Sequence, residues 1–252
     1  MDNKYLNLLA EHYPDRRSVQ GEMLGLHAKL QLPKGTEYFF SDLHGEDGAF
    51  IHLLRSASGN IRTKIRELYE NVMTEKEQNQ LANLIYDPEK VLGLLRKSGR
   101  LTEEWVRITI VRLAEICRYI SAKYPRDEVM SKMPPEYANV LNEFLFIGVG
   151  DVDRNLLYNE IVAFIIRSDL QEDFITAFCF LIQKICVNHL HIIGDIFDRG
   201  KGPHRIMEEL IDFDNLDVQW GNHDIQWMGA ASGNLVCMAS VLRVGISYNN
   251  FD

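Results

Sequence analysis

Three short polar clusters in the sequence contain residue types that bind divalent cations and anions. They read Asp42-Leu43-His44-Gly45, Gly194-Asp195-Ile196-Phe197-Asp198-Arg199-Gly200 and Gly221-Asn222-His223-Asp224. Each cluster follows a run of apolar residues that is typical of a short buried strand. One such cluster is a weak signal, whereas three in succession predict a common site at the strand ends.

The spacing of the clusters indicates metal ligands. Asp42 and His44 are two residues apart, so in an extended segment their side chains project to one face and can bind one ion. Asp195 can bridge that ion and a second one, to which Asn222 offers an amide oxygen. Mixed carboxylate, imidazole and amide ligands suit Mn, Fe or Zn. Two such ions about 3.5–4 Å apart are the usual means of hydrolysing phosphate esters, which these four residues therefore predict.

The remaining polar residues of the clusters are expected to act on the substrate. Asp198 lies too far round the turn from Asp195 to bind the same ion and is placed to hold His223 as a charged donor to the leaving oxygen. Arg199 can bind two phosphoryl oxygens in a bidentate fork. We therefore predict that His223, Asp198 and Arg199 are the catalytic residues.

The elements that must position these clusters are three short strands, each followed by a polar turn and a helix. They are expected at residues 37–41, 189–194 and 216–220. This order predicts a parallel α/β sheet, whose functional side chains gather beyond the carboxyl ends of the strands. His189 and His191 alternate on one face of the second strand, and we interpret them as packed or supporting histidines rather than ligands.

The long segment between the first two strands has helical periodicity. Thr74 with Glu77 fits a capping box, and two apolar stripes recur at helical spacing. The stripes are Val106, Ile110, Leu113, Cys117 and Ile120, and Leu157, Ile161, Phe164 and Ile165. Residues 58–186 are therefore predicted to be an all-helical insertion, and 1–57 with 187–252 to form the α/β core.

Composition excludes several classes of protein. The chain has 252 residues, of which 46% are hydrophobic, and a formal net charge of -9, which argues against a nucleic-acid partner. No apolar block of about 18 residues predicts a membrane span, and the N-terminus lacks a signal-peptide pattern. The four cysteines have no metal or disulfide spacing, so we expect reduced thiols in a cytoplasmic protein without a membrane partner.

The clusters resemble the motifs of a known superfamily. "SDLHGE", "GDIFDRG" and "GNHD" are similar to the D-x-H-G, G-D-x-x-D-R-G and G-N-H-D/E motifs of calcineurin-like metallophosphoesterases, especially the phosphoprotein phosphatase branch. The resemblance implies the same metal ligands, phosphate-binding arginine and acid dyad as the spacing does. It also implies part of a metallophosphoesterase sandwich, interrupted by the large helical insertion.

Other segments narrow the resemblance to one family. The helical insertion, "GNHDIQWMGAASGN" and the terminal "SYNNFD" are similar to the class 3 fructose-1,6-bisphosphatases of bacteria, over essentially the whole chain. This implies the hydrolysis of fructose 1,6-bisphosphate, a sugar bisphosphate, to fructose 6-phosphate in gluconeogenesis (EC 3.1.3.11). The nucleophile is expected to be a hydroxide activated by two ions, with Mn2+ favoured and Fe or Zn as alternatives.

The resemblance also implies that the chain is an amino-terminal portion of such an enzyme. Superfamily members supply further histidines to the second ion from later segments, whereas this sequence has no histidine after His223. We therefore expect an incomplete second-ion site and little turnover by this chain alone. A first sheet without its second sheet is expected to expose an apolar face, which predicts a homo-oligomer.

Two alternatives remain open at this point. One is a metallophosphatase that acts on phosphoproteins or dinucleotide polyphosphates, because the three clusters by themselves do not select the substrate. The other is a catalytically inactive fragment that serves as an assembly module. The polar residues could also be helix caps and solvated ion pairs, although their repeated place after strands favours a metal site.

Overall fold

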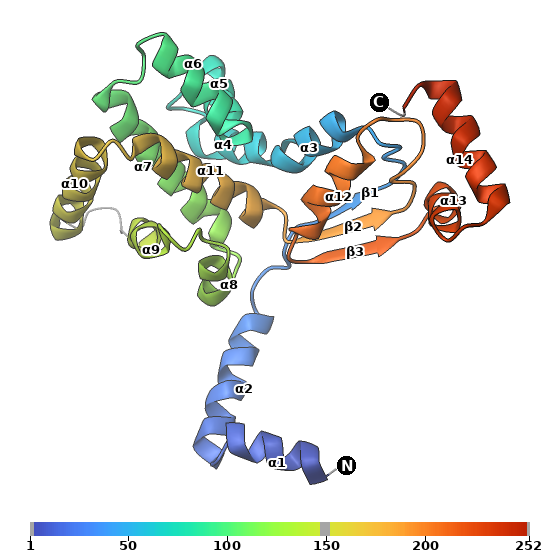
Figure 1. Ribbon diagram of the computed structural model, residues 1–252. Coiled ribbons are helices and arrows are strands. Elements are labelled where there is room, and N and C mark those ends of the chain that lie inside the picture. Colours follow the sequence, from blue (N-terminus) through green and yellow to red (C-terminus); the bar gives the residue numbers. More distant parts are fainter. Residues whose placement is uncertain (1–2, 147–151, 251–252) are drawn as a thin grey trace.

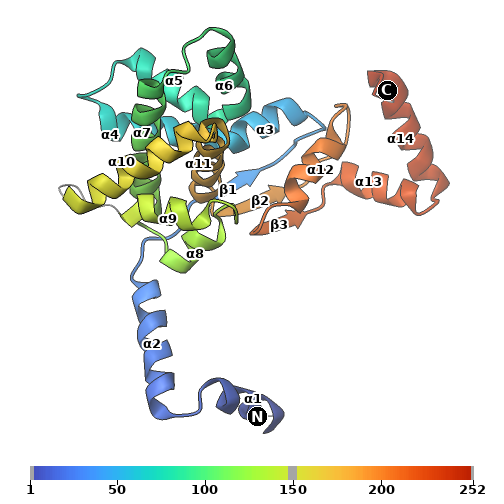
Figure 2. The same cartoon turned by 60° about the vertical axis from the view of Figure 1, so that its left-hand side comes forward.

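The computed structural model describes residues 3–146 and 152–250, so the last two residues of "SYNNFD" lie outside the described residues. Figures 1 and 2 show a projecting arm of two helices, a block of helices, and a small sheet with helices beside it. The arm contains α1 (Asn3–His12) and α2 (Arg16–Leu30), and Asp15 begins α2 with a capping box. A parallel sheet among helices makes this an α/β protein in which helix predominates.

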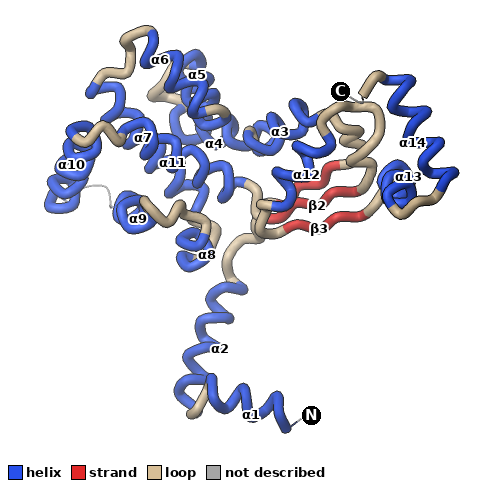
Figure 3. Tube along the Cα trace, in the orientation of Figure 1, coloured by secondary structure: helices blue, strands red, loops and turns tan. Residues whose placement is uncertain are grey.

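The sheet has three parallel strands in the order β1-β2-β3, which Figure 3 shows in red. They are β1 (Glu37–Phe40), β2 (His189–Ile193) and β3 (Leu216–Gln219). The three predicted strands are confirmed, and each ends one residue earlier in the structure than predicted. Phe39, His191 and Asp217 are partners in register across the three strands.

One face of the sheet is covered by α3 (Asp47–Arg55) and α12 (Pro203–Ile211). The two helices and the sheet share a small core, made by Leu43, Phe50, Leu190, Ile192, Ile196, Ile206 and Leu210. On the other face Phe39 and Ile193 are exposed, but they stand among histidines and carboxylates of β1, β2 and β3. The expectation of an apolar open face is therefore wrong, since alternate residues of these strands are polar.

The helical block lies between β1 and β2 in the sequence and has its own larger core. It contains α4 (Asn60–Tyr69), α5 (Glu75–Tyr86), α6 (Pro88–Lys97), α7 (Glu103–Ser121), α8 (Arg126–Ser131), α9 (Ala138–Phe146), α10 (Val152–Arg167) and α11 (Gln171–Cys186), after the short 3-10 turn η1 (Ala57–Gly59). The predicted stripe of α7 is confirmed, because all five of its residues are buried. The capping box of α5 is also confirmed, with Thr74 N donating to Glu77 at 2.8 Å.

The second predicted stripe is confirmed only in part, because Ile161 and Ile165 pack against the helical core and its other two residues do not. On α10, Leu157 and Phe164 are exposed, whereas Val162 and Ile165 are buried. The face that packs is centred on these two residues and on Tyr158, whose ring meets Phe144 edge-on at 4.7 Å between centroids. The neighbouring aromatic side chains, rather than the local apolar spacing, therefore decide which side of α10 is buried.

The chain ends in two helices at the carboxyl edge of the sheet, α13 (Asn222–Ala231) and α14 (Leu235–Tyr248) (Figure 1). Asn234 begins α14 by accepting hydrogen bonds from two backbone nitrogens of its first turn. Among the described helices, none alone has the length and apolar composition of a membrane span, while α13 and α14 meet that criterion only as a pair bent by 116°.

Candidate active site

The loops that follow the three strands are joined by backbone hydrogen bonds beyond the end of the sheet. Asp42 N donates to Gly194 O at 3.2 Å, and His44 N donates to Asp195 O at 2.7 Å. Gly200 N then donates to His44 O at 2.6 Å. The pairing of β1 with β2 is thus extended into the polar clusters, which keeps the clusters side by side.

Two pairs of glycines allow this close approach. A Cβ on Gly45 would lie 2.6 Å from the carbonyl oxygen of Gly200, and one on Gly194 would lie 2.5 Å from the nitrogen of Gly221. Gly45 and Gly194 also have φ values of 76° and 81°, which a side chain rarely adopts. A residue with a side chain at these positions would separate the loops.

Three residues predicted as metal ligands have a left-handed backbone. Their φ values are 56° at Asp42, 48° at His44 and 56° at Asp195. Residues other than glycine rarely adopt such values, and strained conformations concentrate where surrounding structure holds functional groups in place. The hydrogen bonds between the loops supply that support here.

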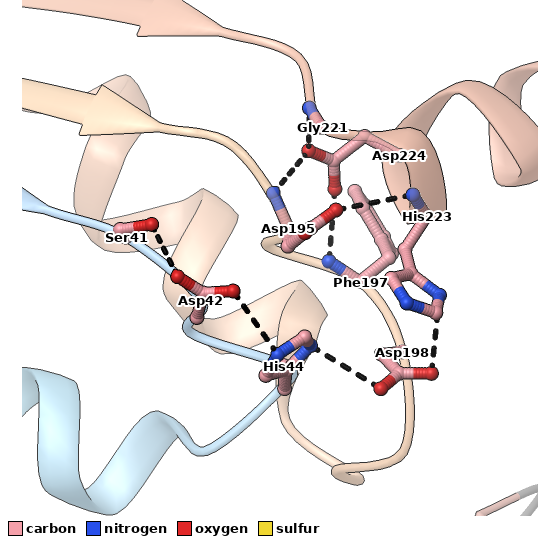
Figure 4. Close-up of polar contacts among 9 residues, drawn as sticks. All are labelled: Ser41, Asp42, His44, Asp195, Phe197, Asp198, Gly221, His223 and Asp224. Atoms are coloured by element: carbon pink, nitrogen blue, oxygen red, sulfur yellow. Dashed lines mark hydrogen bonds and ion pairs between the residues drawn. The ribbon is translucent and has the colours of Figure 1, made fainter.

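Asp42 and His44 lie close together after β1, although their backbones are left-handed rather than extended as predicted. Asp42 Oδ1 lies 3.5 Å from His44 Nε2, and Ser41 Oγ donates to the other carboxylate oxygen (Figure 4). Two ligands of one tetrahedral ion with bonds of about 2.1 Å lie about 3.4 Å apart, so these two atoms have the required separation. The Asp42 side chain is 64% exposed, which leaves the pair open to an ion.

Asp198 lies between two imidazoles. Its carboxylate oxygens are 3.3 Å from His223 Nδ1 and 3.2 Å from His44 Nδ1 (Figure 4). The contact with His223 is the predicted one, whereas the contact with His44 was not expected. The Asp198 side chain is only 11% exposed, and His44 Nδ1 is buried without a hydrogen bond of good geometry. The three side chains therefore form a compact group around one buried carboxylate.

The other predicted residues lie near this group but do not all join it. Asp195 Oδ1 accepts a hydrogen bond from the backbone nitrogen of His223 at 3.1 Å. Among the described residues, the donor atoms of His44, Asp198 and His223 lie within 4.8 Å of one another. The Asp195 carboxylate does not form such a group with the donor atoms of Asp42 and His44. Asn222 and Arg199 are exposed. The predicted four-ligand set and the role of Arg199 thus stay predictions.

The donor set fits a divalent cation of the Mn, Fe or Zn type. It offers carboxylate oxygens and imidazole nitrogens, among them Asp42 Oδ1 and His44 Nε2 at 3.5 Å. Thiols are absent from the group. Carboxylates and imidazoles at the carboxyl edge of a parallel sheet can bind a metal ion, hold a proton and orient a phosphate.

Comparison with known proteins shows to which family the chain belongs. A family model described as Firmicute fructose-1,6-bisphosphatase matches residues 4–252. The chain belongs to the Firmicute fructose-1,6-bisphosphatase family. The resemblance to class 3 fructose-1,6-bisphosphatases is therefore confirmed.

Curated members of the fructose-1,6-bisphosphatase class 3 group are similar over nearly the whole chain. The protein of that name from Parabacteroides distasonis is 45% identical over 99% of this chain and 37% of its own length. Those from Listeria monocytogenes serotype 4b and Clostridium acetobutylicum are 45% and 46% identical, over 100% and 98% of this chain and 39% and 37% of their own lengths. No solved structure matches the chain.

This chain of the fructose-1,6-bisphosphatase family thus spans about two fifths of the length of the relatives that it matches. The matches extend over the whole of the chain. They do not confirm the expectation that the chain is an amino-terminal portion.

Sequence reasoning assigned no role to Asp224, which is fully buried at the base of the site. Its oxygens accept hydrogen bonds from the backbone nitrogens of Asp195, Phe197 and Gly221 at 2.7, 3.0 and 2.9 Å (Figure 4). One carboxylate therefore ties the loop after β2 to the loop after β3. The signal was its place in the third cluster, three residues after Gly221 and in the first turn of α13, where an acid can accept hydrogen bonds from backbone nitrogens.

A second overlooked contact comes from the end of the chain. Asn250 Nδ2 donates to the carbonyl oxygen of Asp198 at 2.9 Å. The segment after α14 therefore reaches back to the turn that carries two of the predicted catalytic residues. The resemblance of "SYNNFD" to the family pointed to this segment but not to its contact.

Proposed function

We propose that the protein is a metal-dependent phosphoric monoester hydrolase (EC 3.1.3.11) that converts fructose 1,6-bisphosphate to fructose 6-phosphate and phosphate in gluconeogenesis. The proposal is supported by membership of the family and by relatives that are named fructose-1,6-bisphosphatase class 3. One structural observation carries it. Asp198 lies between His44 and His223 at the carboxyl edge of the sheet, beside the paired atoms of Asp42 and His44.

The proposed metal ligands are Asp42, His44, Asp195 and Asn222, with Mn2+ as the favoured ion and Fe or Zn as alternatives. When bound, a pair of such ions lowers the pKa of water and stabilises developing negative charge. The separation of Asp42 Oδ1 from His44 Nε2 supports the first ion. Asp195 and Asn222 need to turn their side chains toward that pair, so the second ion is the less supported part of the proposal.

The proposed roles of the remaining residues concern the substrate. His223 donates a proton to the leaving oxygen of the sugar, and the nearly buried carboxylate of Asp198 keeps its imidazole oriented. Arg199 is exposed on the same turn, where its guanidinium can bind two phosphoryl oxygens. Buried hydrogen bonds from Asp224 hold the loops so that these groups face the same phosphate.

The proposed domain division follows the two cores. The helical core supports an all-helical insertion at residues 58–186, and the small sheet core supports a calcineurin-like α/β core at residues 1–57 and 187–252. Four free cysteines, three of them buried, are consistent with a cytoplasmic protein.

We also propose that the chain forms homo-oligomers through its exposed apolar helix faces. On α2 such a face contains Val19, Met23, Leu26 and Leu30, all exposed and spaced by four, three and four residues. On α14 another contains Leu235, Met238, Leu242 and Ile246. Light scattering at increasing protein concentration tests this, because a monomer at all concentrations contradicts it.

The catalytic proposal is tested with the chain in excess over substrate, so that slow turnover is measurable. Phosphate release is followed with Mn2+ from fructose 1,6-bisphosphate, a phosphoserine peptide and a dinucleotide polyphosphate. We expect release from the sugar bisphosphate alone, and a decrease of about 10²–10⁴-fold in His223→Ala. His204→Ala, which removes an exposed histidine of α12, is the matched control and should not change the rate.

Three outcomes contradict the proposal. Faster release from the peptide or from the dinucleotide polyphosphate would favour another metallophosphatase. A rate of phosphate release that is unchanged in His223→Ala would contradict the role of His223 as the general acid. No release above a protein-free Mn2+ blank would favour a non-catalytic assembly module.

A further inference from the structure

The open face of the sheet carries a second group of metal-binding side chains. His189 and His191 are two residues apart on β2, so they project to the same face, opposite α3 and α12. Asp217 is the partner of His191 in register on β3. These residues lie within the strands, whereas the proposed active site lies in the loops beyond them.

One carboxylate oxygen joins both imidazoles. Asp217 Oδ2 lies 2.9 Å from His189 Nε2 and 3.2 Å from His191 Nδ1. Among the described residues, only this group and the one around Asp198 place three such donor atoms within 4.8 Å of one another. Ligand atoms of one ion with bonds of about 2.1 Å lie about 3–3.4 Å apart, and the two distances from Asp217 Oδ2 to the nitrogens are close to that range.

The imidazoles are held in place by stacking. The rings of His189 and His191 are parallel within 5°, with centroids 4.3 Å apart, and Phe39 stacks on the other side of His191 at 4.4 Å. His191 Nε2 is buried in this stack and has no hydrogen-bond partner. Because the two ring planes are parallel, one imidazole must turn before both nitrogens can point at one ion beside Asp217, whose side chain is 66% accessible.

We propose that His189, His191 and Asp217 form a transition-metal site that bridges β2 and β3, separate from the proposed active site. Two imidazoles and one carboxylate suit Zn2+, Co2+, Ni2+ or Cu2+, and not Ca2+ or Mg2+, which take oxygen ligands. Each neutral imidazole binds the ion through one nitrogen and keeps its proton on the other nitrogen. Since the ligands come together only in the folded sheet, binding stabilises the fold.

The site is tested by titrating the chain with Zn2+ and Co2+. Bound ions are counted by equilibrium dialysis, the Co2+ spectrum reports nitrogen ligands, and thermal unfolding reports stabilisation. We expect Asp217→Asn and His191→Phe to lose one bound ion and its rise in Tm. His191→Phe keeps a ring in the stack, and Asp217 is exposed, so both variants should fold. Circular dichroism checks this.

Two comparison variants separate the two sites. His44→Ala, which alters the proposed active site, should keep the ion at β2 and β3, and His204→Ala should bind as the unaltered chain does. The proposal is overturned if Asp217→Asn and His191→Phe bind as many ions as the unaltered chain. It is also overturned if only His44→Ala loses an ion, in which case the group is a metal-free set of hydrogen bonds.

Discussion

Asp224 Oδ2 accepts a hydrogen bond from the backbone nitrogen of Asp195 at 2.7 Å, although 29 positions separate the two residues. The carboxylate belongs to α13, whereas Asp195 follows β2, so the bond joins two strand ends across the site. Because Asp224 is fully buried, its oxygens have no water to replace the backbone donors. The position of Asp195 therefore depends on a residue that need not touch substrate.

Replacing this carboxylate is expected to destabilise the fold. Asp224→Ala leaves three backbone N–H groups unsatisfied and should lower the free energy of unfolding by about 3 kcal/mol. Chemical denaturation of the purified chain measures the change. Asp224→Asn, which keeps one acceptor oxygen, should lose less, and Asp214→Ala, at an exposed position before β3, should lose almost nothing. Equal stability of Asp224→Ala and Asp214→Ala would contradict the claim that the Asp224 carboxylate holds the loops after β2 and β3 together.

The contact between Gly45 and Gly200 predicts a strict requirement for glycine. In Gly200→Ala the new Cβ meets the carbonyl oxygen of His44 at 2.5 Å, and backbone cannot move aside as a flexible side chain can. We expect a loss of about 1–3 kcal/mol in the free energy of unfolding, together with weaker Mn2+ binding. Gly48→Ala on α3, where a Cβ meets nothing within 4 Å, is the matched control. Similar losses in both variants would contradict the close approach.

The contact of Asn250 with Asp198 predicts local ordering of the turn between residues 198 and 202. Asn250→Ala removes the donor to the Asp198 carbonyl oxygen, so the backbone amides of this turn should exchange hydrogen faster. The loss in overall stability should be about 1 kcal/mol. Hydrogen exchange with mass spectrometry measures the turn, and Ser247→Ala on the exposed side of α14 is the control. Unchanged exchange in Asn250→Ala would mean that the end of the chain does not hold the turn.

Buried thiols predict a loss of stability at alkaline pH. Burial raises the pKa of the Cys186 thiol to about 12 and also raises the pKa of Cys117 and Cys179 above the ordinary value of 9.0. Between these values the unfolded chain loses protons that the folded chain keeps, so the free energy of unfolding falls as pH rises above about 9. Below pH 9 the thiols are protonated in both states and contribute no pH dependence.

Denaturation at pH 8 and at pH 10.5 measures this effect. Cys186→Ala should show a smaller decrease between the two values than the unaltered chain does, because one raised thiol is absent. Cys237→Ala is the control, since Cys237 is only partly buried and should not change the slope. Stability that rises with pH over this interval would contradict the predicted direction.

The sequence predicted the sheet well because its signals are local. Each strand is a short segment with alternating apolar residues that ends in a polar cluster, and β1, β2 and β3 all lie where such segments predict them. The contact of Asp198 with His223 followed from the same clusters. Which side of α10 is buried was not predictable from spacing, since Val162 and Ile165 pack into the core of the helical block and Tyr158 meets Phe144 of another helix.

Contacts between distant segments account for what the sequence did not reveal. The Asp224 carboxylate accepts hydrogen bonds from backbone nitrogens. Every residue type except proline has such a nitrogen, so the sequence does not indicate these partners. The contact of Asp198 with His44 depends on how the loops after β1 and β2 join. Likewise His189 and His191 were interpreted as supporting histidines, because their meeting with Asp217 requires the register of β2 with β3.

The central claim is that the loops after the three strands form one cation site. Mn2+ binding, followed by electron paramagnetic resonance, tests it most directly in the unaltered chain, in Asp42→Asn, in His44→Ala and in the control His204→Ala. We predict that the unaltered chain and the control bind Mn2+ alike, and that each of the other two variants binds it at least about tenfold more weakly, because one ligand of the ion is lost. Equal Mn2+ affinity in all four proteins would contradict the account.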